Sequence, residues 1–364
     1  MRSWARVFGL KRILLCALAL VAFVSGASAS DDLQYSGFAL LRGAAGTTDA
    51  PFFSDHFTSQ VQLGIDWRPS PWLGAHVHLL ARNDADGSRR GIAGIPEAYV
   101  EAKFHRGDHR LRVVGGAFFL PTSRENVDAL WESPYTITPS ALNSWFGEEF
   151  RPIGIDLGYT YCGSLTGGVT VFRGNDTFGA LPAVRGWSLR DHWALLGEHL
   201  PVDGTYFTSV SAETDHQLGW AARGRWSNDH ALVQLTHIDN RSDAIEHGEL
   251  LNWYTDFDIA AAEYSTSDWT FAGETGWGNT TVIFDGIGYR NPLRASYVLV
   301  SKRISTVRAS LRAEAFSNAL SHRRAVTAAL FWSPPGTRLR TGIEAITLGG
   351  QKRVSLEMRY SFAK

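Results

Sequence analysis

The sequence has little cysteine, little methionine and no long apolar run after its first segment. Only two cysteines and two methionines occur in 364 residues, and Cys16 lies in the N-terminal segment. Cys162 has no partner in the rest of the chain, so an internal disulfide is excluded. Beyond residue 29, no apolar stretch approaches the roughly 20 residues that a helix needs to cross a bilayer. A disulfide-stapled fold and a bundle of membrane-spanning helices are therefore excluded.

The N-terminal segment has the three parts of an export signal. Four basic side chains precede an apolar run over residues 13–24, and the small residues Ala27 and Ala29 follow it. This pattern predicts a signal peptide over residues 1–29, removed after Ala29. Residues 30–364 contain no proline-rich linker, low-complexity tract or composition break. We therefore predict a single exported domain over residues 30–364.

Charge and motifs exclude several classes of function. Removal of residues 1–29 leaves 31 basic against 36 acidic side chains, a net charge of −5. Such a balance argues against nucleic acid as a partner. The sequence has no G-x-S-x-G, no H-E-x-x-H and no glycine-rich phosphate loop. We therefore expect no enzyme and no bound cofactor or metal.

Apolar and polar residues alternate along almost the whole chain. In the last segment Val354, Leu356, Met358, Tyr360 and Phe362 fall on one face of an extended strand, and charged residues fall on the other. Similar segments of about ten residues recur about sixteen times, starting at residues 33–43. A soluble sheet over a core or a strand between lipid and water would both produce this pattern.

The connections between these segments favour the second alternative, strands that lie between lipid and water. Short connections alternate with long ones. The short ones are 68–71, 105–109, 162–165, 227–230, 266–268, 304–307 and 333–337, and the long ones are 44–56, 83–94, 120–151, 174–216, 239–252 and 279–294. This sorting is typical of outer-membrane barrels, and a soluble sandwich has no reason for it. The fold prediction is an all-β protein, a transmembrane antiparallel up-and-down β-barrel of about 16 strands.

Aromatic residues support the same fold. They stand beside the short connections, at the height where an interfacial girdle belongs. The girdle is predicted to contain Trp67, Trp72, Phe104, Trp226, Trp269, Trp332 and Phe362.

Two strands have an ambiguous orientation. In residues 253–265, Asp256 and Asp258 are expected to face the wet interior, and Glu263 then needs a bulge near residues 260–262 to avoid lipid. Residues 294–303 fit either orientation.

The chain resembles Gram-negative outer-membrane porins. Its last strand ends in an aromatic residue, Phe362, although Ala363 and Lys364 follow, and ITPSALNSWFGEE (137–149) is similar to stretches of porin-like proteins. The resemblance implies an outer-membrane location, a water-filled channel for small hydrophilic solutes and ions, contact with membrane lipid, and the homotrimers that porins often form. It also implies an inward-folded third extracellular loop. The alternative is an outer-membrane barrel enzyme acting on lipid, as a phospholipase or a lipid A modifying enzyme.

The resemblance places the third long connection, residues 120–150, at the constriction. Its acidic candidates are Glu125, Asp128, Glu132, Glu148 and Glu149, and the basic candidates of the facing wall are Arg42, Arg82, Arg308, Arg312, Arg340 and Arg359. The connection carries a net charge of −4. On the facing wall, acidic residues share strand faces with the arginines and neutralise part of their charge. Because rings of acid favour cations, we predict a weak preference for cations.

Overall fold

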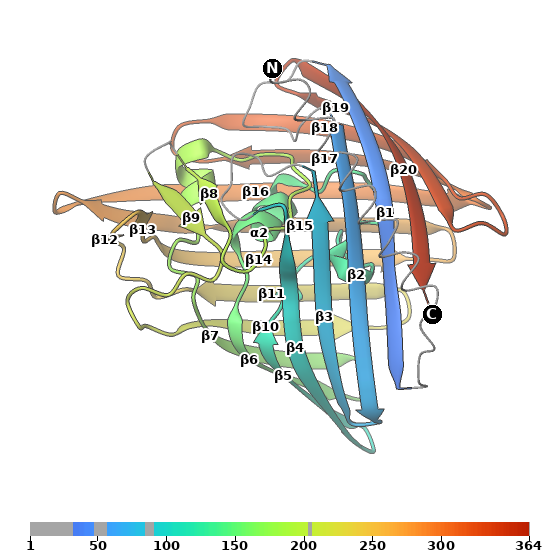
Figure 1. Ribbon diagram of the computed structural model, residues 1–364, viewed down its shortest axis with the longest axis horizontal. Coiled ribbons are helices and arrows are strands. Elements are labelled where there is room, and N and C mark those ends of the chain that lie inside the picture. The colour runs from blue at the N-terminus through green and yellow to red at the C-terminus, as the bar shows by residue number, and fades with distance from the viewer. Residues whose placement is uncertain (1–31, 47–56, 84–90, 203–205, 364) are drawn as a thin grey trace.

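Sixteen strands form one closed antiparallel barrel in the computed structural model, which describes residues 32–46, 57–83, 91–202 and 206–363. Neighbours in sequence pair side by side around the barrel (Figure 1). The strands are β1 Leu33–Gly46, β2 Phe57–Ser70, β3 Leu73–Arg82, β4 Ala93–Arg106, β5 His109–Ala117, β6 Ile153–Tyr161, β7 Leu165–Arg173, β10 Gly219–Ser227, β11 Ala231–Asp239, β14 Tyr254–Ser265, β15 Trp269–Phe284, β16 Ile287–Ile304, β17 Val307–Ser317, β18 His322–Trp332, β19 Leu339–Leu348 and β20 Gln351–Ala363. The all-β barrel prediction and its strand number are confirmed. The predicted signal peptide lies outside the described residues.

The strands have the two faces of a membrane-spanning barrel. Along β17, Ala309, Leu311 and Ala313 are exposed on the outer face, whereas Arg312 and Glu314 are buried on the inner face. The same alternation holds for β18 and β20 over most of their length. Because a closed barrel has no unpaired edge, every backbone polar group within lipid can be satisfied. Among the described residues, no helix has both the length and the apolar character needed to cross a membrane.

The barrel closes where β1 pairs with β20. Gly37 stands opposite Phe362 in this seam, and a Cβ atom on Gly37 would lie 2.6 Å from the Phe362 ring. The absence of a side chain at Gly37 therefore lets the ring pack flat against β1. Phe362 has the same outward parity along β20 as Met358 and Tyr360, as predicted. Its side chain is only 7% exposed, so it contributes little surface to the girdle.

The other predicted girdle aromatics lie on the surface beside the short turns. Their side chains are between 38% and 51% exposed. They are Trp67, Trp72, Phe104, Trp226, Trp269 and Trp332. Amphipathic rings in this position match the boundary between lipid and water.

One predicted long connection is a hairpin instead. Residues 279–294 belong to β15 and β16, which have 16 and 18 residues and join through Asp285 and Gly286. Both turn residues have positive φ, 50° and 75°, as a two-residue hairpin with Asp-Gly requires. The hairpin extends past the neighbouring strands (Figure 1).

The predicted orientation of β14 was also wrong. Its pairing with β11 and β15 runs without a register shift, so the strand has no bulge. Thr255, Phe257 and Ile259 are buried on the inner face, and Asp256 and Asp258 share the outer face. In β16 the inner residues include Tyr297, Leu299 and Ser301, which are buried.

The long connections contain further elements. Helix α2 spans Ala141–Glu149, and two short helical turns, η1 and η2, span Ala129–Trp131 and Leu181–Arg185. A small sheet has the strand order β12-β13-β9-β8. Its strands are β12 Glu246–His247, β13 Leu250–Leu251, β9 Phe207–Ser209 and β8 His199–Pro201. The sequence patterns did not predict this sheet.

The two ends of the barrel are predicted to label differently in cells. Cys162 is exposed in a short turn, and Leu320 is 80% exposed between β17 and β18 at the opposite end. If the long connections face outside, a membrane-impermeant maleimide will label Leu320→Cys, made in a Cys162→Ser background, on intact cells. It will label wild-type Cys162 only after the cells are permeabilised. Labelling of Cys162 alone on intact cells would reverse the topology.

Candidate functional site

Residues 118–152 contact the inner wall on two sides of the barrel. On one side, the backbone N–H of Ile137 donates to Glu344 of β19 at 2.7 Å, and that of Ala141 donates to Glu314 of β17 at 2.8 Å. On another side, Gln234 of β11 donates to the carbonyl of Pro121 at 2.9 Å. We call residues 118–152 the inner segment. Because β11 and β19 are far apart in the strand order, a segment that contacts both lies across the barrel interior.

Arg312 of β17 is the most extensively bonded side chain of this contact. Its side chain is fully buried and ion-paired with Glu125 of the inner segment and, at 2.9 Å, with Glu314 of its own strand. Its guanidinium also donates to the carbonyls of Thr138 at 2.8 Å and Pro139 at 3.2 Å. A planar fork with five N–H donors is the group that suits several acceptors at once.

Glu132 ties the inner segment to the strands beside the seam. It is ion-paired with Arg359 of β20 at 3.1 Å, and it accepts a hydrogen bond from Gln62 of β2 at 3.0 Å. The indole of Trp193 also donates to it at 3.0 Å. Trp193 belongs to residues 174–202 and 206–218, which we call the second inner segment.

Glu148 and Glu149, at the end of α2, join the two inner segments. Burial alone would raise the pKa of Glu148, but the nearby Arg185 and Arg190 hold that pKa below its usual range. Glu149 has no arginine partner among the residues that the structure describes, and it accepts from the Trp145 indole at 2.6 Å and the Thr208 hydroxyl at 2.7 Å. Burial raises the pKa of Glu149 to about 7 despite these donors.

The remaining arginines of the predicted wall mostly have carboxylate partners. Arg42 pairs with Asp191 at 2.5 Å and with Glu357 at 2.7 Å, and Arg340 pairs with the same Glu357 at 3.0 Å. Arg82 pairs with Glu198 of the second inner segment at 2.7 Å.

Arg308 and Asp128 differ from the rest of the predicted set. Arg308 donates to the Ser301 hydroxyl at 3.2 Å and lies over the ring of Tyr135. Asp128 is exposed in the inner segment. Within the described ranges, neither side chain has an ion-pair partner within 4.0 Å.

The structure joins two of the acidic candidates to basic candidates, Glu125 to Arg312 and Glu132 to Arg359. Glu148 pairs instead with Arg185 of the second inner segment. The predicted cation preference assumed an acidic surplus in the inner segment, and these pairs remove that assumption.

Sequence reasoning did not find the second inner segment. It supplies Arg185, Arg190, Asp191 and Glu198, which complete the ion pairs above. The stretch WSLRDHWALLGEHL (187–200) mixes aromatic and charged residues in one long connection. That mixture was the available signal, because a solvated loop seldom carries two tryptophans and several leucines.

An apolar cluster joins both inner segments to the wall. The rings of Trp145 and Phe178 stack with centroids 4.5 Å apart, and Phe257 of β14 packs edge-on against Trp145 at 5.0 Å. The cluster also contains buried residues of β5, β7, β10, β11, β16, β17, β18 and β19. Such packing holds the inner segments in a fixed position.

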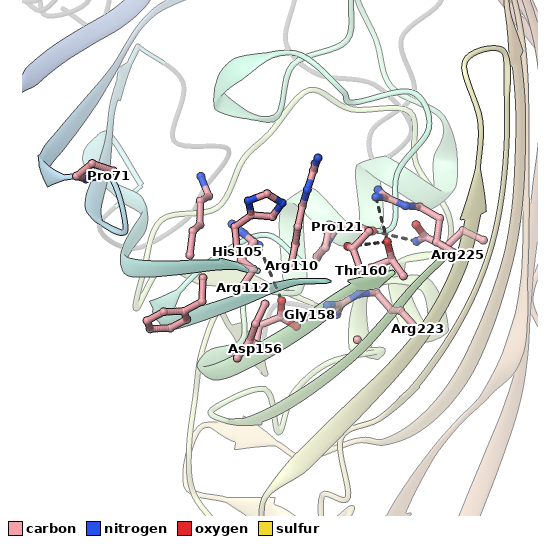
Figure 2. A pocket seen from close by; sticks show the side chains of 16 residues that line it. Pro71, His105, Arg110, Arg112, Pro121, Asp156, Gly158, Thr160, Arg223 and Arg225 are labelled. Carbon is pink, nitrogen blue, oxygen red and sulfur yellow. Dashed lines mark hydrogen bonds and ion pairs between the residues drawn. The ribbon is translucent and has the colours of Figure 1, made fainter. Parts of the chain in front are cut away.

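A cavity of about 590 Å³ opens on the inner wall towards the short turns. Arg110 and Arg112 of β5 and Arg223 and Arg225 of β10 lie along it, near Asp156 of β6 (Figure 2). Its lining includes five permanently cationic side chains and one carboxylate. The cations are Lys103, Arg110, Arg112, Arg223 and Arg225.

The barrel is similar to solved structures of outer-membrane proteins. An anion-selective porin from Comamonas acidovorans matches with a TM-score of 0.59 and 14% identity, over 91% of this chain and 99% of its own. The outer membrane channel DcaP of Acinetobacter baumannii matches with a TM-score of 0.58 and 12% identity, over 92% and 99%. OmpT, an outer membrane protein of Vibrio cholerae in a trimer form, matches with a TM-score of 0.56 and 8% identity, over 91% and 99%.

These similarities concern the fold. No family model matches the sequence, and no curated protein sequence matches it significantly. At 8–14% identity the shared property is the closed barrel.

Proposed function

We propose that this chain is a porin of the Gram-negative outer membrane, exported by its first 29 residues, which lets small hydrophilic solutes and ions diffuse through its barrel. The observation that carries the proposal is the sorting of side chains around a closed barrel. Large apolar residues such as Leu311, Val298 and Leu356 are 49–66% exposed on the outside, whereas charged residues line the inside. A sixteen-stranded barrel encloses an aqueous channel unless it is filled.

The inner segments make this a narrow channel. Their contacts with β2, β11, β17, β19 and β20 leave less open cross-section than a bare barrel would have. We propose that residues 118–152 act as the inward-folded third extracellular loop and that the second inner segment supports them. We also propose that the protein assembles as a homotrimer in outer-membrane lipid, in line with the trimer form of one similar barrel.

Conductance measurements test the proposal. The folded protein, purified from outer membranes and added to a planar bilayer in KCl, should produce discrete current steps that the heat-denatured protein does not produce. The same preparation should not hydrolyse or modify phospholipid or lipid A. A folded barrel without current steps would contradict the proposal, and turnover of either lipid would favour the barrel enzyme.

A further inference from the structure

We propose that the cavity near the short turns is a binding site for small anionic solutes that carry a carboxylate or phosphate group. This inference rests on the proposed channel function and deepens it by naming the solute class. Arg110 of β5 and Arg225 of β10, which both line the cavity, are its main anchors. The argument depends on which cations of the cavity already have partners.

Three cations of the cavity share two carboxylates. Glu101 pairs with Lys103 at 2.5 Å and also with Arg112. Asp156 pairs with Arg223 and lies 3.9 Å from Arg112. These five groups hold one positive charge more than they can neutralise among themselves.

The remaining cations of the cavity, Arg110 and Arg225, have no ion pair within 4.0 Å in the part of the chain that the structure describes. The guanidinium of Arg225 donates to the Thr166 hydroxyl at a long 3.4 Å. The site therefore has a clear positive surplus.

The guanidinium of Arg225 is partly shielded from water and not fully satisfied. Its Nε atom is buried and has no hydrogen-bond partner among the described residues. An unpartnered buried donor costs free energy, and an anion bound to the same guanidinium offsets that cost.

The geometry suits an oxyanion on a small organic molecule. A guanidinium presents two parallel N–H groups that match the two oxygens of a carboxylate or phosphate. Thr160, Thr166 and Gln234 add polar groups to the lining. A cavity of about 590 Å³ falls in the size range of pockets for small ligands, roughly 300–1,000 Å³.

The cavity also concentrates anions beside the inner segment. Pro121, whose carbonyl accepts from Gln234, is part of its lining. Positive charge held against low-dielectric walls raises the local concentration of anions. The wild-type channel should therefore prefer anions, which is opposite to the preference predicted from the sequence.

The first test measures current. Succinate, glucose 6-phosphate, inorganic phosphate and neutral glucose are titrated separately into channels conducting KCl. We expect the two organic anions to reduce the current in a saturable way and glucose to have no effect. Arg225→Gln and Arg110→Gln should each weaken the block at least ten-fold, and Arg290→Gln, an exposed position on the β15–β16 hairpin, should leave it unchanged. Block by inorganic phosphate alone would restrict the site to inorganic anions and overturn the proposal of an organic solute.

The zero-current potential in a KCl gradient supplies a second readout. We expect anion preference in wild type and a smaller preference in Arg225→Gln. Arg225→Lys keeps the positive charge but loses the two parallel N–H groups of the guanidinium. This variant should therefore keep the anion preference and lose most of the succinate block. Cation preference in wild type would overturn the proposal even if the channel conducts.

A binding measurement separates this proposal from the proposed function. Isothermal titration calorimetry of detergent-solubilised protein measures succinate binding without any current. Saturable heat of binding with succinate, lost in Arg225→Gln, supports the site even if no conductance is found. Normal conductance without saturable binding or block would leave the channel function standing and refute the anion site. The heat-modifiable mobility of each variant on gels confirms that it is folded.

Discussion

Arg312→Met is expected to lower the free energy of unfolding by about 3–5 kcal/mol, because breaking a buried ion pair leaves an uncompensated charge. Glu125 and Glu314 would both lose their guanidinium partner while fully buried. The backbone carbonyls of Thr138 and Pro139 would lose a donor as well. The methionine keeps the apolar stem of the side chain, so the loss reports on the charge and its hydrogen bonds.

Urea unfolding in lipid vesicles, followed by tryptophan fluorescence, measures this effect. The double variant Arg312→Met/Glu125→Gln should recover part of the loss, since it removes one of the buried charges that the single variant leaves unpaired. We also expect the single variant to release the inner segment from β17 and to raise the single-channel conductance. Equal stability and conductance of Arg312→Met and wild type would show that these contacts do not hold the inner segment.

Leu311→Arg is expected to lower the free energy of unfolding in the bilayer by roughly 2–4 kcal/mol, the cost of an arginine on the lipid face near the bilayer midplane. Leu311 is 49% exposed in the middle of β17, between two inward-facing residues. Leu320→Arg is the matched control. Leu320 is 80% exposed but lies in the connection after β17, outside the apolar belt.

The comparison uses urea titrations of both variants in the same lipid. A loss of stability in Leu311→Arg but not in Leu320→Arg supports the orientation of β17. Equal losses for the two variants would mean that Leu311 does not face lipid.

The barrel was predictable because its signals are local. Alternation along each strand gives its two faces, and the sorting of connection lengths gives the up-and-down order. The pairing of Arg312 with Glu125 joins residues 187 positions apart. No local pattern specifies such a pair, so the candidates could be named from the sequence but not matched.

The orientation of β14 was wrong for a physical reason. The prediction assumed that the inner wall is polar everywhere, which placed Asp256 and Asp258 inside. Phe257 and Ile259 instead pack against the inner segments in the apolar cluster. Asp258 is outside, and its carboxylate accepts a hydrogen bond from the ring of His237 at 3.0 Å. Where a strand of the wall packs against an apolar inner segment, its inner face is apolar instead of polar. The sequence of the strand alone does not show what that face will pack against.

The seam between β1 and β20 has a consequence for assembly. It joins the two ends of the barrel domain, with Arg42 opposite Glu357, so this is the pairing with the greatest sequence separation and the largest loop-closure entropy. Both inner segments connect strands among the first eight of the barrel, and they pack against strands among the last eight. If the seam forms last, the inner segments are enclosed as the wall is completed. Strands β14 to β19 then pack against the apolar cluster before β20 pairs with β1.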